Sequence, residues 1–197
     1  PQCAMNSGTI HNATAPGDEA GHEMPRYVVA FPEWPQAIRE RIDAVRAAHD
    51  PQAGLIAPHL TLVFGVRGVT ETALTRHLRH AVADMKPFDI HLDTLRLHRE
   101  GPHGWVYWSV GDGAPDLHCL HAAIHTGPLA GAHDPARPFD PHITLASGPN
   151  ATALQSLVES EAASWPDCRV TLEALWIGSI AQSRFVSGSR VALGGAA

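Results

Sequence analysis

The chain carries almost the same pentapeptide twice. Residues 58–62 have the sequence Pro-His-Leu-Thr-Leu, and residues 141–145 have the sequence Pro-His-Ile-Thr-Leu, 83 positions further on. The two copies differ in one aliphatic side chain, and each places a titratable imidazole two residues before a hydroxyl. Such a duplication is difficult to obtain by chance. It predicts two related structural halves, each of which contributes one His-x-Thr unit to a shared site.

Each pentapeptide belongs to an apolar run that is typical of a β-strand. Side chains two residues apart on a strand lie on the same face, roughly 6–7 Å apart. His59 and Thr61 are therefore expected on one face, and Leu60, Leu62 and Phe64 on the other. The aliphatic face would pack under helices, which leaves the polar face open to solvent or a ligand. The second copy repeats this arrangement.

The residue types of the two motifs fit acid–base chemistry on a phosphate group. Histidine titrates near neutral pH, so one imidazole can act as a base while the other acts as an acid. His59 and His142 on opposite sides of a phosphorus atom would suit an in-line displacement without a metal ion. The hydroxyls of Thr61 and Thr144 can donate hydrogen bonds to phosphoryl oxygens.

Short β-branched or aromatic runs alternate with helical patterns along the chain. We predict an α+β fold with two pseudo-symmetric lobes, in which two antiparallel-rich sheets flank a central cleft and the helices lie outside. Strands are expected at residues 27–31, 60–64, 88–97, 105–110, 143–146, 170–180 and 184–193, and helices at 35–49, 70–85, 117–124 and 154–165.

Composition limits the classes of protein to which the chain can belong. Its 197 residues, 44% hydrophobic and 17% charged, fit one globular domain, which we place at residues 25–197 as two lobes. Residues 1–24 are rich in small and polar residues, and we expect a flexible N-terminal extension. No apolar run reaches the length of a membrane span, and the three cysteines, odd in number and without C-x-x-C spacing, favour a cytoplasmic location.

The net charge of −6 disfavours a large, sequence-independent grip on nucleic acid, because that requires many Lys and Arg residues. A small nucleotide or an RNA terminus is therefore the expected partner. We expect a monomer with no obligate protein partner and no membrane association.

The two motifs resemble those of the 2H phosphoesterase superfamily, and in particular its bacterial 2′-5′ RNA ligase-like branch. The similar segments read PHLTLVF at residues 58–64 and FDPHITLAS at residues 139–147, and the resemblance covers residues 25 to about 193. It implies a bilobal fold and metal-independent, cofactor-free chemistry on cyclic phosphodiesters. It also implies that His59 and His142 are the acid–base pair and that Thr61 and Thr144 bind the phosphate.

One departure from the family pattern affects how the charge of the phosphate is balanced. Some members place a basic residue just after the second motif, where this chain has Ala146 and Ser147. Arg137, five residues before the second motif histidine, is either a substitute or a solvated loop charge. The further candidate substrate contacts are Ser147, Arg137, Tyr27 and Trp105, of which the aromatic residues would stack on a base or belong to the core.

Three other histidines form a pattern of their own. His118, His121 and His125 fall on one face of an expected helix and could form a metal-binding stripe. No carboxylate or cysteine completes a ligand set, so we interpret them as the polar face of a helix whose apolar face holds Leu117 and Leu120, and predict no metal site.

These patterns predict an enzyme that hydrolyses a cyclic phosphodiester, such as the 2′,3′-cyclic phosphate of a nucleotide or RNA end. The sequence leaves open which histidine is the acid. Two alternatives also remain open. The same site could join RNA ends through a 2′-5′ linkage, or the motifs could bind a nucleotide or RNA phosphate without turnover.

Overall fold

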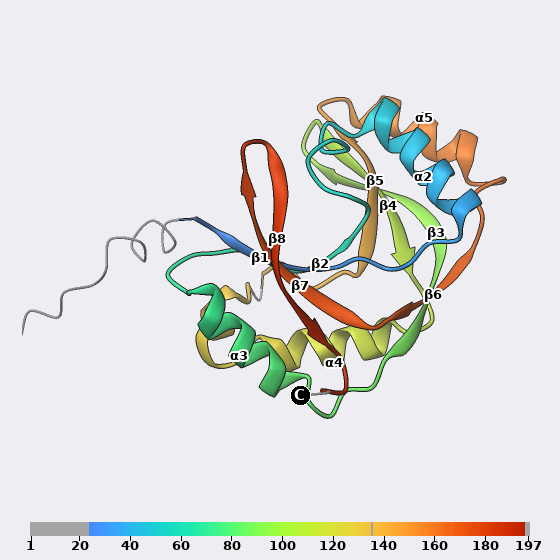
Figure 1. Ribbon diagram of the computed structural model, residues 1–197. Helices are drawn as coiled ribbons and strands as arrows, with labels where there is room; N and C mark the ends of the chain where they lie inside the picture. Colours follow the sequence, from blue (N-terminus) through green and yellow to red (C-terminus); the bar gives the residue numbers. More distant parts are fainter. Residues whose placement is uncertain (1–23, 135, 196–197) are drawn as a thin grey trace, which may run out of the picture.

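Two four-stranded antiparallel sheets form the centre of the molecule (Figure 1). The computed structural model describes residues 24–134 and 136–195, so the extension predicted for residues 1–24 lies outside the described part except for Met24. The first sheet has the order β2 (Leu60–Val66), β1 (Arg26–Ala30), β7 (Ala174–Ala181), β8 (Arg184–Ala192), and the second has the order β5 (His142–Gly148), β4 (His103–Val110), β3 (Phe88–Glu100), β6 (Cys168–Leu172).

The two sheets repeat one arrangement, as the duplicated motif predicts. Each motif strand, β2 or β5, lies at the end of the strand order of its sheet. Each pairs antiparallel with a neighbour, β1 or β4, from which one α-helix separates it in sequence, with a further 3-10 helix before β5. The predicted bilobal, duplicated α+β fold is therefore confirmed.

The second sheet is covered by α2 (Gln36–His49) and α5 (Ala151–Glu161), which lie side by side (Figure 1). The Arg41 guanidinium of α2 forms a salt bridge with Glu161 of α5, with an N–O distance of 2.9 Å. Beneath the helices, the fully buried ring of Trp108 on β4 packs against the rings of Trp34 and Trp165. These contacts fix both helices to the outer face of the second sheet.

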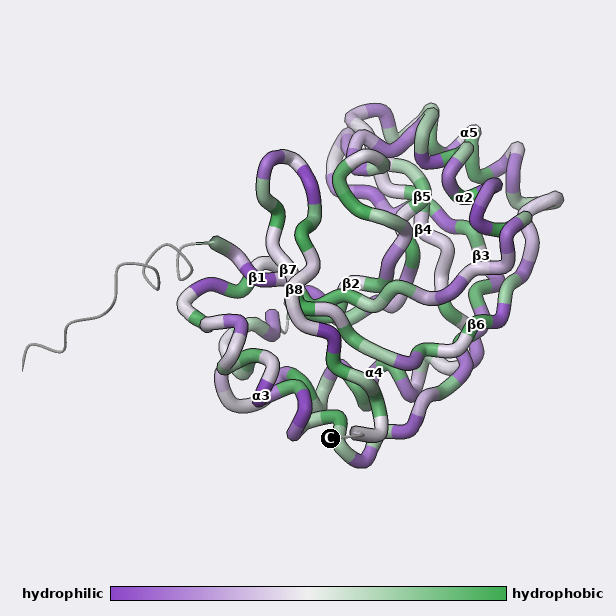
Figure 2. Tube along the Cα trace, in the orientation of Figure 1, coloured by the Kyte–Doolittle hydropathy of each residue, from purple (hydrophilic) through white to green (hydrophobic). Residues whose placement is uncertain are grey.

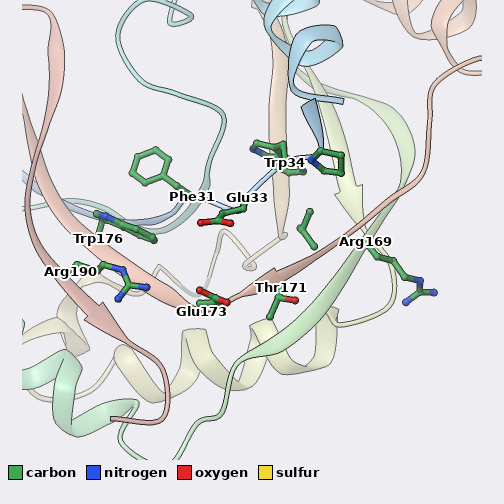
Figure 3. A pocket seen from close by; sticks show the side chains of 10 residues that line it. Phe31, Glu33, Trp34, Arg169, Thr171, Glu173, Trp176 and Arg190 are labelled. Atoms are coloured by element: carbon green, nitrogen blue, oxygen red, sulfur yellow. The ribbon is translucent and has the colours of Figure 1, made fainter. Parts of the chain in front are cut away.

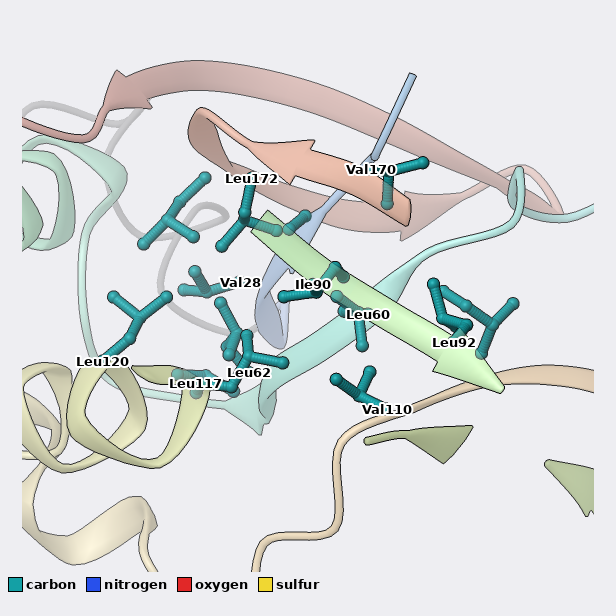
Figure 4. Packing of buried hydrophobic residues seen from close by; sticks show 14 of the residues in the cluster. Val28, Leu60, Leu62, Ile90, Leu92, Val110, Leu117, Leu120, Val170 and Leu172 are labelled. Atoms are coloured by element: carbon teal, nitrogen blue, oxygen red, sulfur yellow. The ribbon is translucent and has the colours of Figure 1, made fainter. Parts of the chain in front are cut away.

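The first sheet is covered by α3 (Glu71–Ala81) and α4 (Ala114–Ile124), with the 3-10 helix η1 (Gly127–Ala132) beside them (Figure 1). Figure 4 shows Leu117 and Leu120 of α4 beside Val28 and Leu62 of the first sheet, and all four belong to one buried cluster. His77 of α3 donates a hydrogen bond from Nε2 to the carbonyl of Ile124, at 2.8 Å.

The two halves of the chain therefore exchange helices. Helix α2 leaves strand β1 of the first sheet and covers the second, whereas α4 leaves strand β4 of the second sheet and lies on the first. Hydrophilic residues follow the outer surfaces of α2 and α3, and hydrophobic residues gather where strands meet helices (Figure 2). One continuous buried cluster includes residues of both sheets.

One predicted strand is wrong. Residues 170–180 form two strands rather than one, because the chain leaves the second sheet after Leu172 and enters the first at Ala174. Strand β6 pairs with β3, and β7 pairs with β1. Glu173 is the single residue between the two strands, so the apolar sequence pattern continues across the break almost without interruption.

Helix limits also differ from the predictions, for local reasons. The helix predicted at residues 70–85 ends at Ala81, and Thr70 accepts a hydrogen bond from the backbone N–H of Ala73 at its start. The helix predicted at 154–165 begins at Ala151, because the Asn150 side chain caps it, and ends at Glu161. Over the part of the chain that the structure describes, every helix is too short or too polar to cross a membrane.

Candidate functional site

The two motif histidines are held in the same way. The Nδ1 atom of His59 lies 2.8 Å from the carbonyl oxygen of Ala57, and the Nδ1 atom of His142 lies 2.6 Å from that of Asp140. A carbonyl can only accept, so Nδ1 carries the hydrogen in both rings. In each imidazole this leaves Nε2 without a proton when the ring is neutral. Both histidines thus present the same free nitrogen for proton transfer.

Burial controls the ionisation of both histidines. It lowers the pKa of His59 to about 4 and the pKa of His142 to about 4, because desolvation disfavours the charged ring. A positive charge on His59 would further lower the pKa of His142. In the free protein at pH 7 both imidazoles are therefore neutral.

Each motif strand contains a β-bulge just after its threonine. In β2, Thr61 pairs with Val29 whereas Val63 pairs with Val28, so Leu62 is an extra residue. In β5, Thr144 pairs with Tyr107 and Ala146 pairs with Val106, with Leu145 between them. A bulge puts two residues opposite one and reverses the alternation of faces beyond it. Two consecutive buried residues follow the threonine in both strands.

The bulge in β2 makes one prediction wrong. Phe64 was expected on the buried face with Leu60 and Leu62, but its side chain is 83% exposed and lines the same cavity as Thr61. Val63 takes the buried position instead. The equivalent residue after the second bulge is Ser147, which is half-buried.

A cavity of about 710 Å³ adjoins the second motif. Of the predicted site residues, Thr61, Arg137 and His142 belong to its wall. The wall also contains aromatic, histidine and acidic side chains, namely Phe64, His98, Glu100, Tyr107, His121, His125, His133, Asp134, Phe139 and Asp140. It therefore combines an apolar surface for a ring with polar groups that converge on one motif histidine, as small-molecule sites do.

Three residues outside the predicted set of site contacts hold His142 in place. The Tyr107 ring stacks on its imidazole, with centroids 3.4 Å apart and an interplanar angle of 14°. The Arg96 guanidinium lies over the Tyr107 ring, 5.2 Å from its centroid. It also donates a hydrogen bond to Ser109 Oγ at 2.7 Å and forms a salt bridge with the Asp140 carboxylate. Arg96 therefore ties together the ring that stacks on His142 and the residue whose carbonyl anchors it.

The first histidine has different neighbours. The Phe31 ring lies 6.1 Å from the imidazole of His59. A buried salt bridge between Arg46 and Asp50, with an N–O distance of 2.9 Å, lies near enough for both charges to act on the pKa of His59. Asp50 also accepts a hydrogen bond from the backbone N–H of Gln52, which fastens the loop that leads to the motif.

Two of the three histidines of the stripe, His121 and His125, belong to the cavity wall. Leu117 and Leu120 of α4 are buried, as predicted, but His121 and His125 line the cavity, with His133 beside them. The ring centroids of His121 and His125 lie 3.9 Å apart. The ring centroid of His133 lies 5.6 Å from that of His121 and 5.7 Å from that of His125. Burial lowers the pKa of His121 to about 4 and also lowers that of His125. Within residues 24–134 and 136–195, no group of three or more His, Cys, Asp or Glu side chains is placed to hold a metal ion.

Of the further candidate contacts, Arg137 belongs to the cavity wall, whereas Tyr27, Trp105 and Ser147 do not. The Tyr27 ring meets Phe64 edge to face, with centroids 5.4 Å apart. Trp105 packs against His98, which does line the cavity, with ring centroids 5.8 Å apart. Ser147 is the register partner of Trp105 across β4 and β5. Arg137 lies in the cavity wall, 4.0 Å from Glu100, and its side chain is 76% exposed.

Comparison with known proteins decides the family. A sequence model of the 2′-5′ RNA ligase superfamily matches residues 34–184, which include both motifs. The chain belongs to this superfamily. A protein of Oceanobacillus iheyensis named "Putative phosphoesterase" is 30% identical over 121 residues, which cover 60% of this chain and 68% of that protein. A Bacillus licheniformis protein with the same name is 29% identical over 121 residues, with the same coverage.

Solved structures of E. coli LigT share the fold. E. coli LigT in complex with 3′-AMP superimposes with a TM-score of 0.56 at 23% identity, over 87% of this chain and 99% of LigT. LigT in its apo form gives a TM-score of 0.53 at 24% identity, over 88% of this chain and all of the other. This likeness concerns the two-sheet architecture.

Proposed function

We propose that this superfamily member is a metal-independent phosphodiesterase that hydrolyses 2′,3′-cyclic phosphates of nucleotides or RNA ends. The observation that carries the proposal is the matched anchoring of His59 and His142. In both, Nδ1–H donates to the carbonyl two residues earlier, which leaves Nε2 of each ring free for proton transfer. Such a pair suits two proton transfers in one displacement.

In the proposed reaction, water attacks phosphorus on one side while a ribose oxygen leaves on the other. A neutral imidazole takes the proton of the water, and a protonated imidazole supplies the proton of the leaving oxygen. The hydroxyls of Thr61 and Thr144 donate hydrogen bonds to the phosphoryl oxygens. These side chains supply both proton transfers, so no step is routed through a metal ion or cofactor.

We assign His59 as the base and His142 as the acid. After burial and the backbone hydrogen bond, the largest influence on His142 is the negative charge of Asp140, which raises its pKa. The corresponding influence on His59 is the positive charge of Arg46, which lowers its pKa. We propose that the proton needed by the leaving oxygen is held by His142, whose charged ring the Asp140 carboxylate stabilises. A bound phosphate anion would add negative charge between the rings and stabilise this protonated form.

The test is the hydrolysis of 2′,3′-cyclic AMP in the presence of a chelator, followed by chromatography of the monophosphate product. We expect turnover that survives chelation and falls by roughly 10²-fold or more in H59A and H142A, the scale for the loss of an acid–base group. The exposed His80, changed to Ala, is the matched control and should keep full activity. Binding of cyclic phosphates without turnover would support a phosphate-binding module instead. Activity that is sensitive to the chelator and indifferent to both variants would overturn the mechanism.

A further inference from the structure

A buried ion pair lies at the C-terminal end of α2, in the segment that precedes the first motif. The guanidinium of Arg46 and the carboxylate of Asp50 are 2.9 Å apart, and their side chains are only 4% and 2% exposed. Nε of Arg46 donates a hydrogen bond to Oδ2 of Asp50 at 2.9 Å. Desolvation of two buried charges offsets much of their attraction, so such a pair contributes little net stability. Its presence therefore indicates another role.

The helix itself does not explain Asp50. This residue is the C-cap of α2, where the helix dipole disfavours a negative charge. The pair instead holds the backbone of Gln52, which lies beyond the helix. Oδ1 of Asp50 accepts a hydrogen bond from the Gln52 N–H at 3.0 Å, and the Arg46 guanidinium donates to the Gln52 carbonyl at 3.4 Å. Both charged groups thus fix the first residues of the loop.

A tight turn connects this fixed point to the motif. The backbone N–H groups of Leu55 and Ile56 donate to the Gln52 carbonyl at 2.9 Å and 3.2 Å. The next residue, Ala57, supplies the carbonyl that accepts the hydrogen bond from Nδ1 of His59. The hydrogen bond made by one ring nitrogen decides which nitrogen carries the hydrogen. The conformation of residues 52–57 therefore sets the tautomer of the imidazole.

The first sheet fastens the same loop at a second point. The backbone N–H of Phe185, in β8, donates to the Leu55 carbonyl at 2.7 Å. The Phe185 ring packs on Phe31, with centroids 5.8 Å apart. Phe31 lies beside Trp176 (Figure 3), and its ring centroid is 6.1 Å from that of His59. The loop is therefore held by the first sheet as well as by the ion pair.

The second half of the chain has an equivalent device. Arg96 forms a salt bridge with Asp140, and the carbonyl of Asp140 accepts the hydrogen bond from Nδ1 of His142 at 2.6 Å. In both halves, an arginine–aspartate pair thus holds the backbone segment whose carbonyl binds the motif histidine. This repetition supports a common purpose, because the two pairs come from unrelated positions in their lobes.

We propose that Arg46 and Asp50 are positioning residues for His59, which hold residues 52–57 so that the Ala57 carbonyl keeps the ring hydrogen on Nδ1. The catalytic consequence rests on the proposed function, because only a free Nε2 can take the proton of the attacking water. The structural part, the tautomer of His59, does not depend on turnover. The ion pair acts through this ring and makes no contact with the substrate in the proposal.

The kinetic experiment replaces the pair by apolar side chains in R46M/D50L, an exchange that is often neutral for stability. We expect kcat for 2′,3′-cyclic AMP to fall by roughly 10- to 100-fold, the scale for a misplaced catalytic group, with KM within about threefold of wild type. R39M/D43L makes the same changes in an exposed ion pair of the same helix and should leave both constants unchanged. A folded R46M/D50L with unchanged kcat would overturn the proposal.

Long-range ¹H–¹⁵N NMR of the imidazole nitrogens at pH 7 tests the tautomer directly. The signals of His59 are those that disappear in H59Q. We expect hydrogen on Nδ1 in wild-type protein and in R39M/D43L, and a shift in R46M/D50L toward the Nε2–H form that free histidine favours in water. This shift would support the positioning role even in a protein that hydrolyses no cyclic phosphate. An unchanged tautomer overturns the role, whatever the activity.

The milder variant D50N gives the same readouts should R46M/D50L fail to fold. An Asn side chain has one acceptor oxygen where the carboxylate has two, so the contact with either Arg46 or Gln52 is lost. We expect a smaller shift of the His59 tautomer in the same direction, and a smaller fall in kcat. In that case, a His59 tautomer that D50N leaves unchanged overturns the proposal.

Discussion

The proton carried by the histidine pair sets the pH at which the proposed reaction can run. Burial lowers the pKa values of His59 and His142 to about 4, so the form with one proton on the pair is most abundant near that pH in the free protein. Above it, this form declines by tenfold per pH unit. A bound phosphate raises the pKa of the protonated ring, so the same form persists to higher pH in the complex.

We therefore expect kcat/KM for 2′,3′-cyclic AMP to fall between pH 5 and pH 8, with a slope near −1 on a logarithmic scale, while kcat begins to fall only at a higher pH. The profile of kcat/KM reports the free enzyme, and that of kcat reports the complex. D140N removes the charge that raises the pKa of His142, so its kcat/KM profile should shift to lower pH. The exposed carboxylate of Asp84, changed to Asn, is the control. A kcat/KM that stays constant from pH 5 to pH 8 contradicts this account.

At this scale the sequence identifies the candidate motif residues but not the side chains that contact them, for a physical reason. His59, Thr61, His142 and Thr144 are recognisable because residues two apart share a face of one strand. The contacts of Arg96 cannot be found in that way. They depend on the pairing of β3, β4 and β5, which places Arg96 beside Tyr107. In this position the Arg96 guanidinium forms its salt bridge with Asp140. Neither partner lies near Arg96 in the sequence.

At the scale of elements, the bulges in β2 and β5 shape the cavity. Without the extra residue, Phe64 would follow Leu60 and Leu62 into the core. With it, an aromatic ring that is 83% exposed faces the same cavity as Thr61. A side chain this exposed contributes little to stability, so its position favours a role in binding a base.

The variant F64A should raise KM for 2′,3′-cyclic AMP by about 10-fold, because base stacking contributes roughly 1–3 kcal/mol. The melting temperature should change by less than that of a core variant, and F64Y should restore most of the affinity. The exposed Val186, changed to Ala, controls for the loss of surface apolar area. An F64A variant with unchanged KM, or with a large drop in melting temperature, would show that the ring serves the fold instead.

The sequence does not reveal these bulges because both residues at each bulge are apolar. The pair Leu62 and Val63 is compatible with two consecutive buried residues. It is equally compatible with regular alternation, in which Leu62 is buried and Val63 lies on the open face. The same ambiguity hides the break between β6 and β7, where Glu173 alone separates two apolar strands of different sheets. Strand existence is therefore predictable here, whereas register and sheet membership are decided by pairing with distant segments.

At the scale of the whole molecule, the exchange of helices makes each sheet depend on the other half of the chain. The sequence predicts α2 and α4 from their periodicity, but periodicity does not specify which sheet a helix covers. The structure places α2 on the second sheet, where Arg41 meets Glu161 and Trp34 meets Trp108. Unfolding of one lobe would therefore remove a helix that covers the sheet of the other lobe.

We therefore expect the chain to unfold in one cooperative transition, even when only one lobe is weakened. Ile42 of α2 is fully buried against the second sheet, and I42A should lower the free energy of unfolding by about 2–5 kcal/mol, the range for a large-to-small core change. Differential scanning calorimetry should show a single endotherm at a lower temperature, with equal calorimetric and van't Hoff enthalpies. A48S changes an exposed position of the same helix and should stay within about 0.5 kcal/mol of wild type. A second endotherm in I42A that carries only part of the enthalpy would mean that the second sheet melts alone, and that the exchanged helices do not couple the lobes.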